Sequence, residues 1–128
     1  PGGMLEKGES SQEAAIRETY EELGIKAQVI NIIGPLTPFY IPISGFNVFP
    51  FVGWIAKCPT LEIQSKEVSK VFAPSVSSLM NPQNRKIKKS TILDQKVEIP
   101  YFSLNNEIVW GATSMILSEF KSIVKRIK

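Results

Sequence analysis

Half of the acidic residues of this 128-residue chain lie within its first 22 positions. Most of the segment that holds them is a predicted helix, capped at Ser10 and ended at Gly24. Ser10 and Glu13 have the spacing of a capping box, in which each side chain accepts a hydrogen bond from the other residue's backbone amide. Gly24 stands where a glycine ends a helix. A helix of fixed length and strong negative charge is therefore the first constraint on the fold. The glutamates are Glu6, Glu9, Glu13, Glu18, Glu21 and Glu22.

The spacing of the last three glutamates makes their carboxylates neighbours on one helix face. Glu18 is three residues from Glu21 and four from Glu22, and each such like-charge pair costs about 0.2–0.5 kcal/mol in an isolated helix. A hard divalent cation such as Mg²⁺ prefers oxygen ligands and removes that repulsion. A solvated helix face is the alternative, and spacing alone favours it. The apolar residues lie on the opposite side of the helix: Ile16, Tyr20 and Leu23.

The residues that are missing restrict the chemistry. The chain has no histidine, which excludes imidazole bases and histidine-bound metals. Its single cysteine, Cys58, has no partner for an internal disulfide and indicates a reduced, cytoplasmic protein. No apolar run approaches the roughly eighteen residues of a membrane span. Acid–base and metal chemistry therefore fall to carboxylates, lysine, tyrosine or water.

The charge is distributed unevenly along the chain. Up to Lys26 there are three basic and six acidic residues, whereas the remainder has twelve basic and six acidic residues. An acidic end on a basic body indicates a cation at one end and an anionic ligand reaching toward the other. Two solvated surfaces are the alternative, which charge counts alone favour.

The pattern downstream of the helix predicts alternating short elements and hence an α+β fold. We expect a strand over Ala27 to Ile33, a loop with short extended pieces over Pro35 to Gly45, and a buried strand over Phe46 to Ala56 broken at Pro50. A further strand is predicted over Val68 to Phe72, followed by a short helix from Pro74 to about Met80.

The C-terminal half predicts a hairpin and a long helix. The hairpin pairs Arg85–Ile92 with Lys96–Phe102, and Asn105-Asn106 turns the chain into a strand over Ile108 to Trp110. The last helix starts near Gly111, and its expected core-facing residues are Ala112, Met115, Ile116, Phe120, Ile123, Val124 and Ile127. One domain over 1–128 accounts for all of these elements.

The residues around the glutamate helix match a known pattern. Seven fixed positions fall at its offsets: Gly3, Glu9, Arg17, Glu18, Glu21, Glu22 and Gly24. This arrangement resembles the Nudix box, the signature of the Nudix hydrolases. Of the two positions that are usually aliphatic, Ile25 fits and Thr19 departs. The resemblance implies an α/β/α sandwich in which a mixed sheet lies between helices. The family's first strands lie upstream of the box, so we expect the domain to be incomplete at its N-terminus.

The resemblance also implies a site. Nudix hydrolases cleave a pyrophosphate in nucleoside diphosphates linked to another group, usually with Mg²⁺ and here with Mn²⁺ as a second candidate. Glu18 and Glu22 would be the principal metal ligands, with Glu21 and the carbonyl of Gly3 as further ligands. Arg17 and Glu9 would pair to hold the loop against the helix. The general base would come from the box, as Glu21, or from a later loop, as Glu67. An ordinary exposed glutamate is an equal alternative for Glu67.

A second resemblance concerns the substrate. The segment from Ile108 to Thr113, Ile-Val-Trp-Gly-Ala-Thr, is similar to the coenzyme A pyrophosphatase branch, which implies coenzyme A or an acyl derivative as substrate. Arg85 and Lys86, with Lys88 and Lys89, are candidates to meet its phosphates, and a solvated hairpin is the alternative. The runners-up are a housecleaning pyrophosphatase for ADP-ribose or oxidised nucleotides and a non-catalytic binding module. The expected partner is a small nucleotide-derived molecule rather than nucleic acid or a membrane, and a homodimer is left open.

Overall fold

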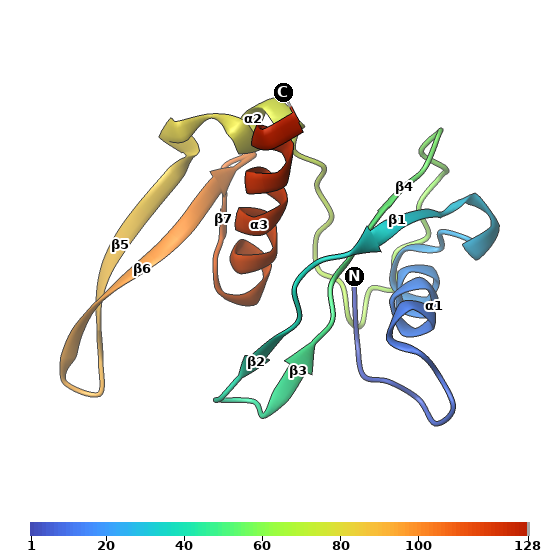
Figure 1. Ribbon diagram of the computed structural model, residues 1–128, viewed down its shortest axis with the longest axis horizontal. Helices are drawn as coiled ribbons and strands as arrows, with labels where there is room; N and C mark the ends of the chain where they lie inside the picture. Colours follow the sequence, from blue (N-terminus) through green and yellow to red (C-terminus); the bar gives the residue numbers. More distant parts are fainter. Residues whose placement is uncertain (128) are drawn as a thin grey trace. The chain divides into compact units, whose positions relative to one another are not determined.

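The computed structural model describes residues 1–127 of the chain, which form two compact units divided between Val71 and Phe72. Helices and antiparallel strands occur in both parts of the sequence (Figure 1). The α+β class expected from the sequence is therefore confirmed. No helix within the described residues is long and apolar enough to cross a membrane.

The first unit contains a helix and two small sheets. Helix α1 spans Ser11–Leu23 and is followed by a short 3-10 turn. The strands are β1 (Asn31–Pro35), β2 (Phe39–Ile41), β3 (Phe46–Val48) and β4 (Phe51–Trp54). β1 pairs with β4 and β2 with β3, both antiparallel. In Figure 1 the β2–β3 pair continues from the β1–β4 pair.

The strand predicted over Ala27 to Ile33 begins and ends later than expected. Residues 27–29 form the 3-10 turn, and the strand begins only at Asn31 and runs through Gly34 to Pro35. The pairing register with β4 shifts between Ile32 and Gly34, as at a β-bulge, and the strand continues through the glycine. The predicted break at Pro50 is confirmed, because β3 ends at Val48 and β4 begins at Phe51.

The predicted burial of the 46–56 segment is wrong, since Trp54 is 53% exposed and the glycine before it is also exposed. β4 pairs with a single strand within the described residues, and a two-stranded ribbon covers few of its own side chains. The strand predicted over Val68 to Phe72 is also wrong. The amide of Val68 instead donates to the carbonyl of Gln64 at 2.8 Å, in a turn.

The second unit is a three-stranded sheet packed on a helix. Its elements are α2 (Val76–Met80), a 3-10 turn over Pro82–Asn84, β5 (Arg85–Ile92), β6 (Gln95–Leu104), β7 (Glu107–Val109) and α3 (Gly111–Ile127). The predicted hairpin, the last strand and the start of the long helix are all confirmed. Both hairpins turn on pairs of residues with positive φ, as tight two-residue hairpin turns require: Leu93-Asp94 and Asn105-Asn106.

The core of the second unit lies where α2, α3 and β6 meet. Phe102 is fully buried and Leu104 is 2% exposed, and Leu79 completes the cluster. From α3, Leu117 and Phe120 pack against it. The prediction that Met115 and Ile127 face the core is wrong, since they are 55% and 79% exposed. The helical period identifies an apolar stripe, but the sheet behind it covers only part of that stripe.

Candidate metal centre

Helix α1 is defined at both ends by the residues that predicted it. The backbone amide of Glu13 donates to Ser10 Oγ at 3.1 Å, and the amide of Ser10 donates to Glu13 Oε1 at 3.3 Å. Gly24 has φ 73° and its amide donates to the carbonyl of Tyr20 at 2.8 Å. The predicted capping box and terminating glycine are confirmed. The glutamates between them therefore have fixed positions around the helix.

The buried side of α1 is not the side that apolar residues predicted. Its two buried residues are Ala14 and Glu18, whereas Tyr20 is 56% exposed. Glu18 is covered from the N-terminal segment: a β-carbon added at Gly3 would collide with the Glu18 carboxylate. A carboxylate is thus held where helices usually bury carbon. This position costs free energy unless the charge has partners.

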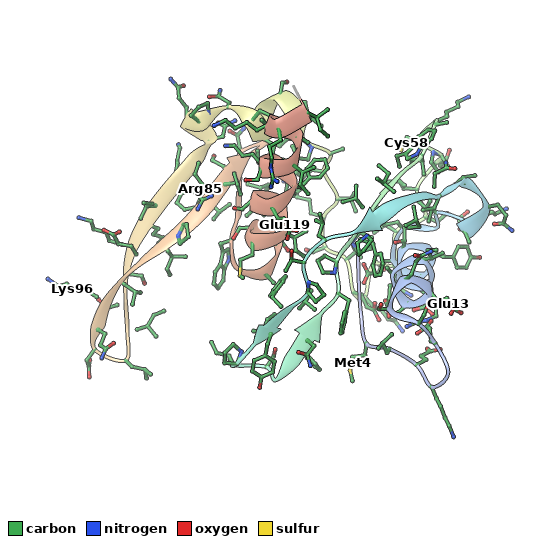
Figure 2. All side chains as sticks on the ribbon, viewed as in Figure 1. Met4, Glu13, Cys58, Arg85, Lys96 and Glu119 are labelled. Atoms are coloured by element: carbon green, nitrogen blue, oxygen red, sulfur yellow. The ribbon has the colours of Figure 1, made fainter. Side chains whose placement is uncertain are left out.

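Arg17 joins the N-terminal segment to the glutamates of α1. Its Nε donates to Glu9 Oε1 at 2.7 Å, and its Nη2 donates to Glu9 Oε2 at 3.2 Å and to the Met4 carbonyl at 2.9 Å. Its Nη1 donates to Glu18 Oε1 at 2.9 Å and to Glu21 Oε2 at 3.1 Å. The expected pairing of Arg17 with Glu9 is confirmed. Figure 2 labels Met4 in the segment that leads into α1 and Glu13 on the helix itself.

These contacts fix the charge states of the pair. The hydrogen bond from Arg17, and then one from the backbone amide of Glu6 at 2.9 Å, hold the pKa of Glu9 below its ordinary value of 4.5. The carboxylate of Glu9 in turn raises the pKa of Arg17. Both groups are therefore charged at neutral pH, and the loop over residues 3–9 is tied to the helix by charge-assisted hydrogen bonds, which are the stronger kind.

Three carboxylates meet beside this network. Oxygens of Glu18, Glu22 and Glu67 all lie within 4.8 Å of one another. The three residues are graded in exposure: Glu18 is buried, Glu22 half-buried and Glu67 exposed. All donors are hard oxygens, the ligands that Mg²⁺ and Mn²⁺ take. The glycine at position 3 leaves room against Glu18 that a side chain would fill. The residues present therefore fit a divalent cation.

Glu67 reaches this group because its loop lies on the end of α1. The amide of Glu62 donates to the carbonyl of Leu23, and the amide of Gln64 donates to the carbonyl of Glu22, both at 2.9 Å. Sequence reasoning identified Glu67 as a candidate but missed Glu62 and Gln64. Backbone hydrogen bonds between distant segments leave no residue-type signal. The one available clue was Gly24, where an added β-carbon would lie 2.7 Å from Glu62 Cβ.

The other predicted site residues lie elsewhere. Glu21 is outside the group of three, with its carboxylate about half exposed and bound to Arg17. Arg85 lies in the second unit, where its Nη1 donates to Ser118 Oγ at 3.1 Å and its guanidinium lies 5.2 Å from the centre of the Phe102 ring. Lys86 is exposed on the same strand. Figure 2 shows Arg85 and Lys96 at opposite ends of the hairpin. Substrate binding by Arg85 and Lys86 stays a prediction.

Comparison with known proteins agrees with the box. The model of the NUDIX domain family matches residues 1–94, so the chain belongs to this family. It is 39% identical over 83 residues to Nudix hydrolase 3 of Caenorhabditis elegans, an alignment covering 62% of this chain and 35% of that protein. It is 30% identical over 125 residues to the uncharacterized Nudix hydrolase NudL of Enterobacter sp. (strain 638), covering 93% of this chain and 62% of the relative.

A third relative extends the match along nearly the whole chain. NudL of Photorhabdus laumondii is 25% identical over 126 residues, covering 98% of this chain and 67% of the relative. The chain thus spans between about a third and two thirds of the length of these relatives. Residues beyond position 94, which the family model does not match, align with the NudL proteins.

Proposed function

We propose that this chain is a divalent-metal-dependent hydrolase that cleaves the pyrophosphate of a nucleoside diphosphate linked to another moiety. The observation on which the proposal rests is the group of three carboxylates, Glu18, Glu22 and Glu67, beside Gly3. Three carboxylates supply the negative charge and the hard oxygen donors that hold divalent cations, and these cations would in turn bind the diphosphate oxygens. Membership of the Nudix family supports the same conclusion.

The metal-binding residues in this proposal are Glu18, Glu22 and Glu67, with the Gly3 carbonyl and Glu21 as additional candidates. Mg²⁺ is the first choice and Mn²⁺ the second, because both accept carboxylate oxygens and retain bound water. A bound ion would supply charge for the phosphate oxygens and lower the pKa of an attacking water. Arg17 positions the site, since it donates to Glu18 and ties the loop ahead of the helix through Glu9.

The two candidates for the general base differ in their surroundings. One oxygen of Glu21 is engaged by Arg17 Nη1 at 3.1 Å, which restricts that carboxylate. Glu67 is exposed and lies with the other two carboxylates, so that it has access to both solvent and the proposed ion. We therefore assign the removal of a proton from water to Glu67 first and to Glu21 second. Replacing either by glutamine separates the roles, because a variant that lacks the general base loses the decline of kcat toward low pH, whereas a variant that lacks only a metal ligand keeps it.

For the substrate we propose coenzyme A or an acyl-coenzyme A, cut into 3′,5′-ADP and a phosphopantetheine. The support is the segment from Ile108 to Thr113 and the basic start of β5, where Lys86 is exposed. Arg85 is the weaker candidate of the two, since its guanidinium already binds Ser118 and lies over Phe102. The proposal predicts that Lys86→Ala raises KM for coenzyme A more than for ADP-ribose, which lacks the 3′-phosphate.

The experiment is product analysis with coenzyme A, ADP-ribose and oxidised nucleotides in the presence of Mg²⁺. Turnover of coenzyme A supports the substrate assignment, and an intact coenzyme A beside another hydrolysed substrate replaces it with the housecleaning alternative. Glu22→Gln is expected to remove activity, and Glu98→Gln, on the exposed hairpin, serves as the matched control. Absence of turnover for every substrate by the wild-type protein would favour a binding module.

A further inference from the structure

The loop that brings Glu67 to the carboxylates is joined to α1 by backbone hydrogen bonds at two points. We call residues Glu62 to Val68 the docking loop. Its amides at Glu62 and Gln64 donate to the carbonyls of Leu23 and Glu22 at 2.9 Å. The last carbonyls of a helix have no partner inside the helix and need one from elsewhere. The docking loop supplies that partner, so the same two hydrogen bonds satisfy the end of α1 and hold the loop in place.

Gln64 is the residue on which this arrangement depends. Its amide makes the bond to the Glu22 carbonyl, and its own carbonyl accepts from the amides of Val68 at 2.8 Å and Glu67 at 3.1 Å. Its side-chain oxygen accepts from the amide of Lys66 at 3.3 Å. One residue thus fixes the loop to the helix and closes the turn that presents Glu67. Its bond to the Glu22 carbonyl also ties the loop to a residue that provides one of the three carboxylates.

Electrostatics oppose this arrangement when no cation is present. Docking brings the carboxylate of Glu67 within 4.8 Å of those of Glu18 and Glu22. Like charges at such distances repel, and burial of Glu18 reduces the screening by water. Glu67 itself is exposed, and so are Glu62 and Gln64. The loop is therefore held by a few hydrogen bonds at the surface, which is typical of segments that open locally.

We propose that metal binding and docking of this loop are coupled, with Gln64 as the positioning residue for Glu67. The proposal rests on the metal site of the proposed function. A cation that binds all three carboxylates binds the docked loop more tightly than the undocked one. By linkage, the metal then favours docking by the same factor by which docking favours the metal. The docking loop therefore docks on the end of α1 more often when the ion is bound.

The first test is residue-resolved amide exchange by NMR, with and without Mg²⁺. We expect Mg²⁺ to slow exchange at Glu62 and Gln64 by about 10- to 100-fold, the usual range for loss of a group that supports a metal. Glu67→Gln should abolish this dependence on Mg²⁺. Glu62→Gln is the matched control, because it removes a charge from the same loop but from outside the carboxylate group, and it should keep the dependence. Exchange that ignores Mg²⁺ in the wild type while Mg²⁺ binds would overturn the coupling.

The second test is a mutant cycle on Mn²⁺ affinity, measured by the electron paramagnetic resonance of free Mn²⁺. Gln64→Pro removes the amide, whereas Gln64→Ala keeps it and should bind Mn²⁺ nearly as the wild type does. If Gln64 acts through Glu67, then Gln64→Pro and Glu67→Gln each weaken binding about 10- to 100-fold. The double variant is then no worse than either, because both remove the same ligand. Losses that multiply would show a general structural role and refute the proposal.

The experiments distinguish a wrong metal site from a metal site that is right but not coupled to docking of the loop. If Glu18→Gln and Glu22→Gln leave Mn²⁺ affinity unchanged, the proposed metal site is wrong and the coupling fails with it. If they weaken Mn²⁺ affinity but Gln64→Pro does not, the metal site is supported and the coupling through Gln64 is refuted. Circular dichroism checks that α1 is intact in each variant. Should Gln64→Pro unfold the chain, the exchange experiment on Glu67→Gln decides the question alone.

Discussion

Gly24 adopts a left-handed conformation and also permits the close approach of the docking loop, and a comparison of Gly24→Ala with Gly45→Ala separates these two roles. The residue has φ 73°, a conformation that side chains disfavour, and it also lies against the docking loop. An added β-carbon would lie 2.7 Å from Glu62 Cβ and 3.1 Å from the Glu62 amide nitrogen. Gly45 has the same φ of 73° but nothing within 4 Å of the added atom. Gly45→Ala is therefore a matched control that has the conformational cost without the collision.

The two variants should differ by the effect of the displaced loop. Alanine in the left-handed region costs about 1–2 kcal/mol, which a stiffer unfolded chain offsets by about 0.4–1 kcal/mol. Both variants should thus lose about 1 kcal/mol. Relieving the collision at Gly24 requires the nearest contact of 2.7 Å to reach ordinary van der Waals range, which begins at 3.4 Å. A shift of that size moves the 2.9 Å bond from Glu62 to Leu23 beyond hydrogen-bonding range, at a cost of about 1 kcal/mol more.

Urea denaturation and Mn²⁺ titration measure the two effects. Gly24→Ala should lower the free energy of unfolding by about 2 kcal/mol, and Gly45→Ala by about 1 kcal/mol. Because the shifted loop takes Glu67 with it, Gly24→Ala should also weaken Mn²⁺ binding about 10-fold or more, and Gly45→Ala should leave it unchanged. Equal behaviour of the two variants in both assays would refute the argument that the glycine is needed for the close approach of the loop.

Three further predictions concern the supports of the site and the core. The pKa of Glu9 is lowered in the folded chain, so the stability that this carboxylate contributes is fully present above pH 4.5 and is lost as the pH falls through the lowered pKa. Glu9→Gln should therefore flatten the decline of Tm below pH 4.5. A decline of Tm as steep as in the wild type contradicts this. Ser10→Ala removes the cap on the Glu13 amide and should cost about 1 kcal/mol in urea denaturation, and an unchanged midpoint contradicts this. Phe102→Ala empties a fully buried site and should cost about 3–5 kcal/mol, and a loss below 1 kcal/mol would show that Phe102 is not central to this core.

The features that sequence alone determined are those with local physical causes. The capping box at Ser10, the glycine that ends α1 and the turn at Asn105-Asn106 each depend on residues within a few positions of one another. The offsets of the box also placed Arg17 against Glu9, eight residues apart in the sequence. In each case the residue type itself is the cause, either through its side-chain hydrogen bond or through the backbone conformation it permits.

Predictions failed where the outcome depended on what lies opposite a segment. The apolar pattern predicted a buried strand at Phe46 to Ala56 and a buried stripe to the end of α3, yet Trp54 and Ile127 are exposed. Periodicity states which side of an element is apolar, and it does not state whether another element covers that side. The strand predicted over Val68 to Phe72 failed for the same reason: β-propensity needs a neighbouring strand to take effect.

The glutamates near the N-terminus owe part of their arrangement to the sequence and part to the tertiary structure. The sequence determined that Glu18 and Glu22 lie on one helix face, because a helix has a fixed period. Only the tertiary structure decided that Glu67 joins them and that Glu21 turns to Arg17 instead. The backbone bonds from Glu62 and Gln64 to the end of α1 bring the loop there. Every residue except proline has a backbone N–H that can make such a bond, so these bonds leave no residue-type signal in the sequence and appear only once the chain has folded.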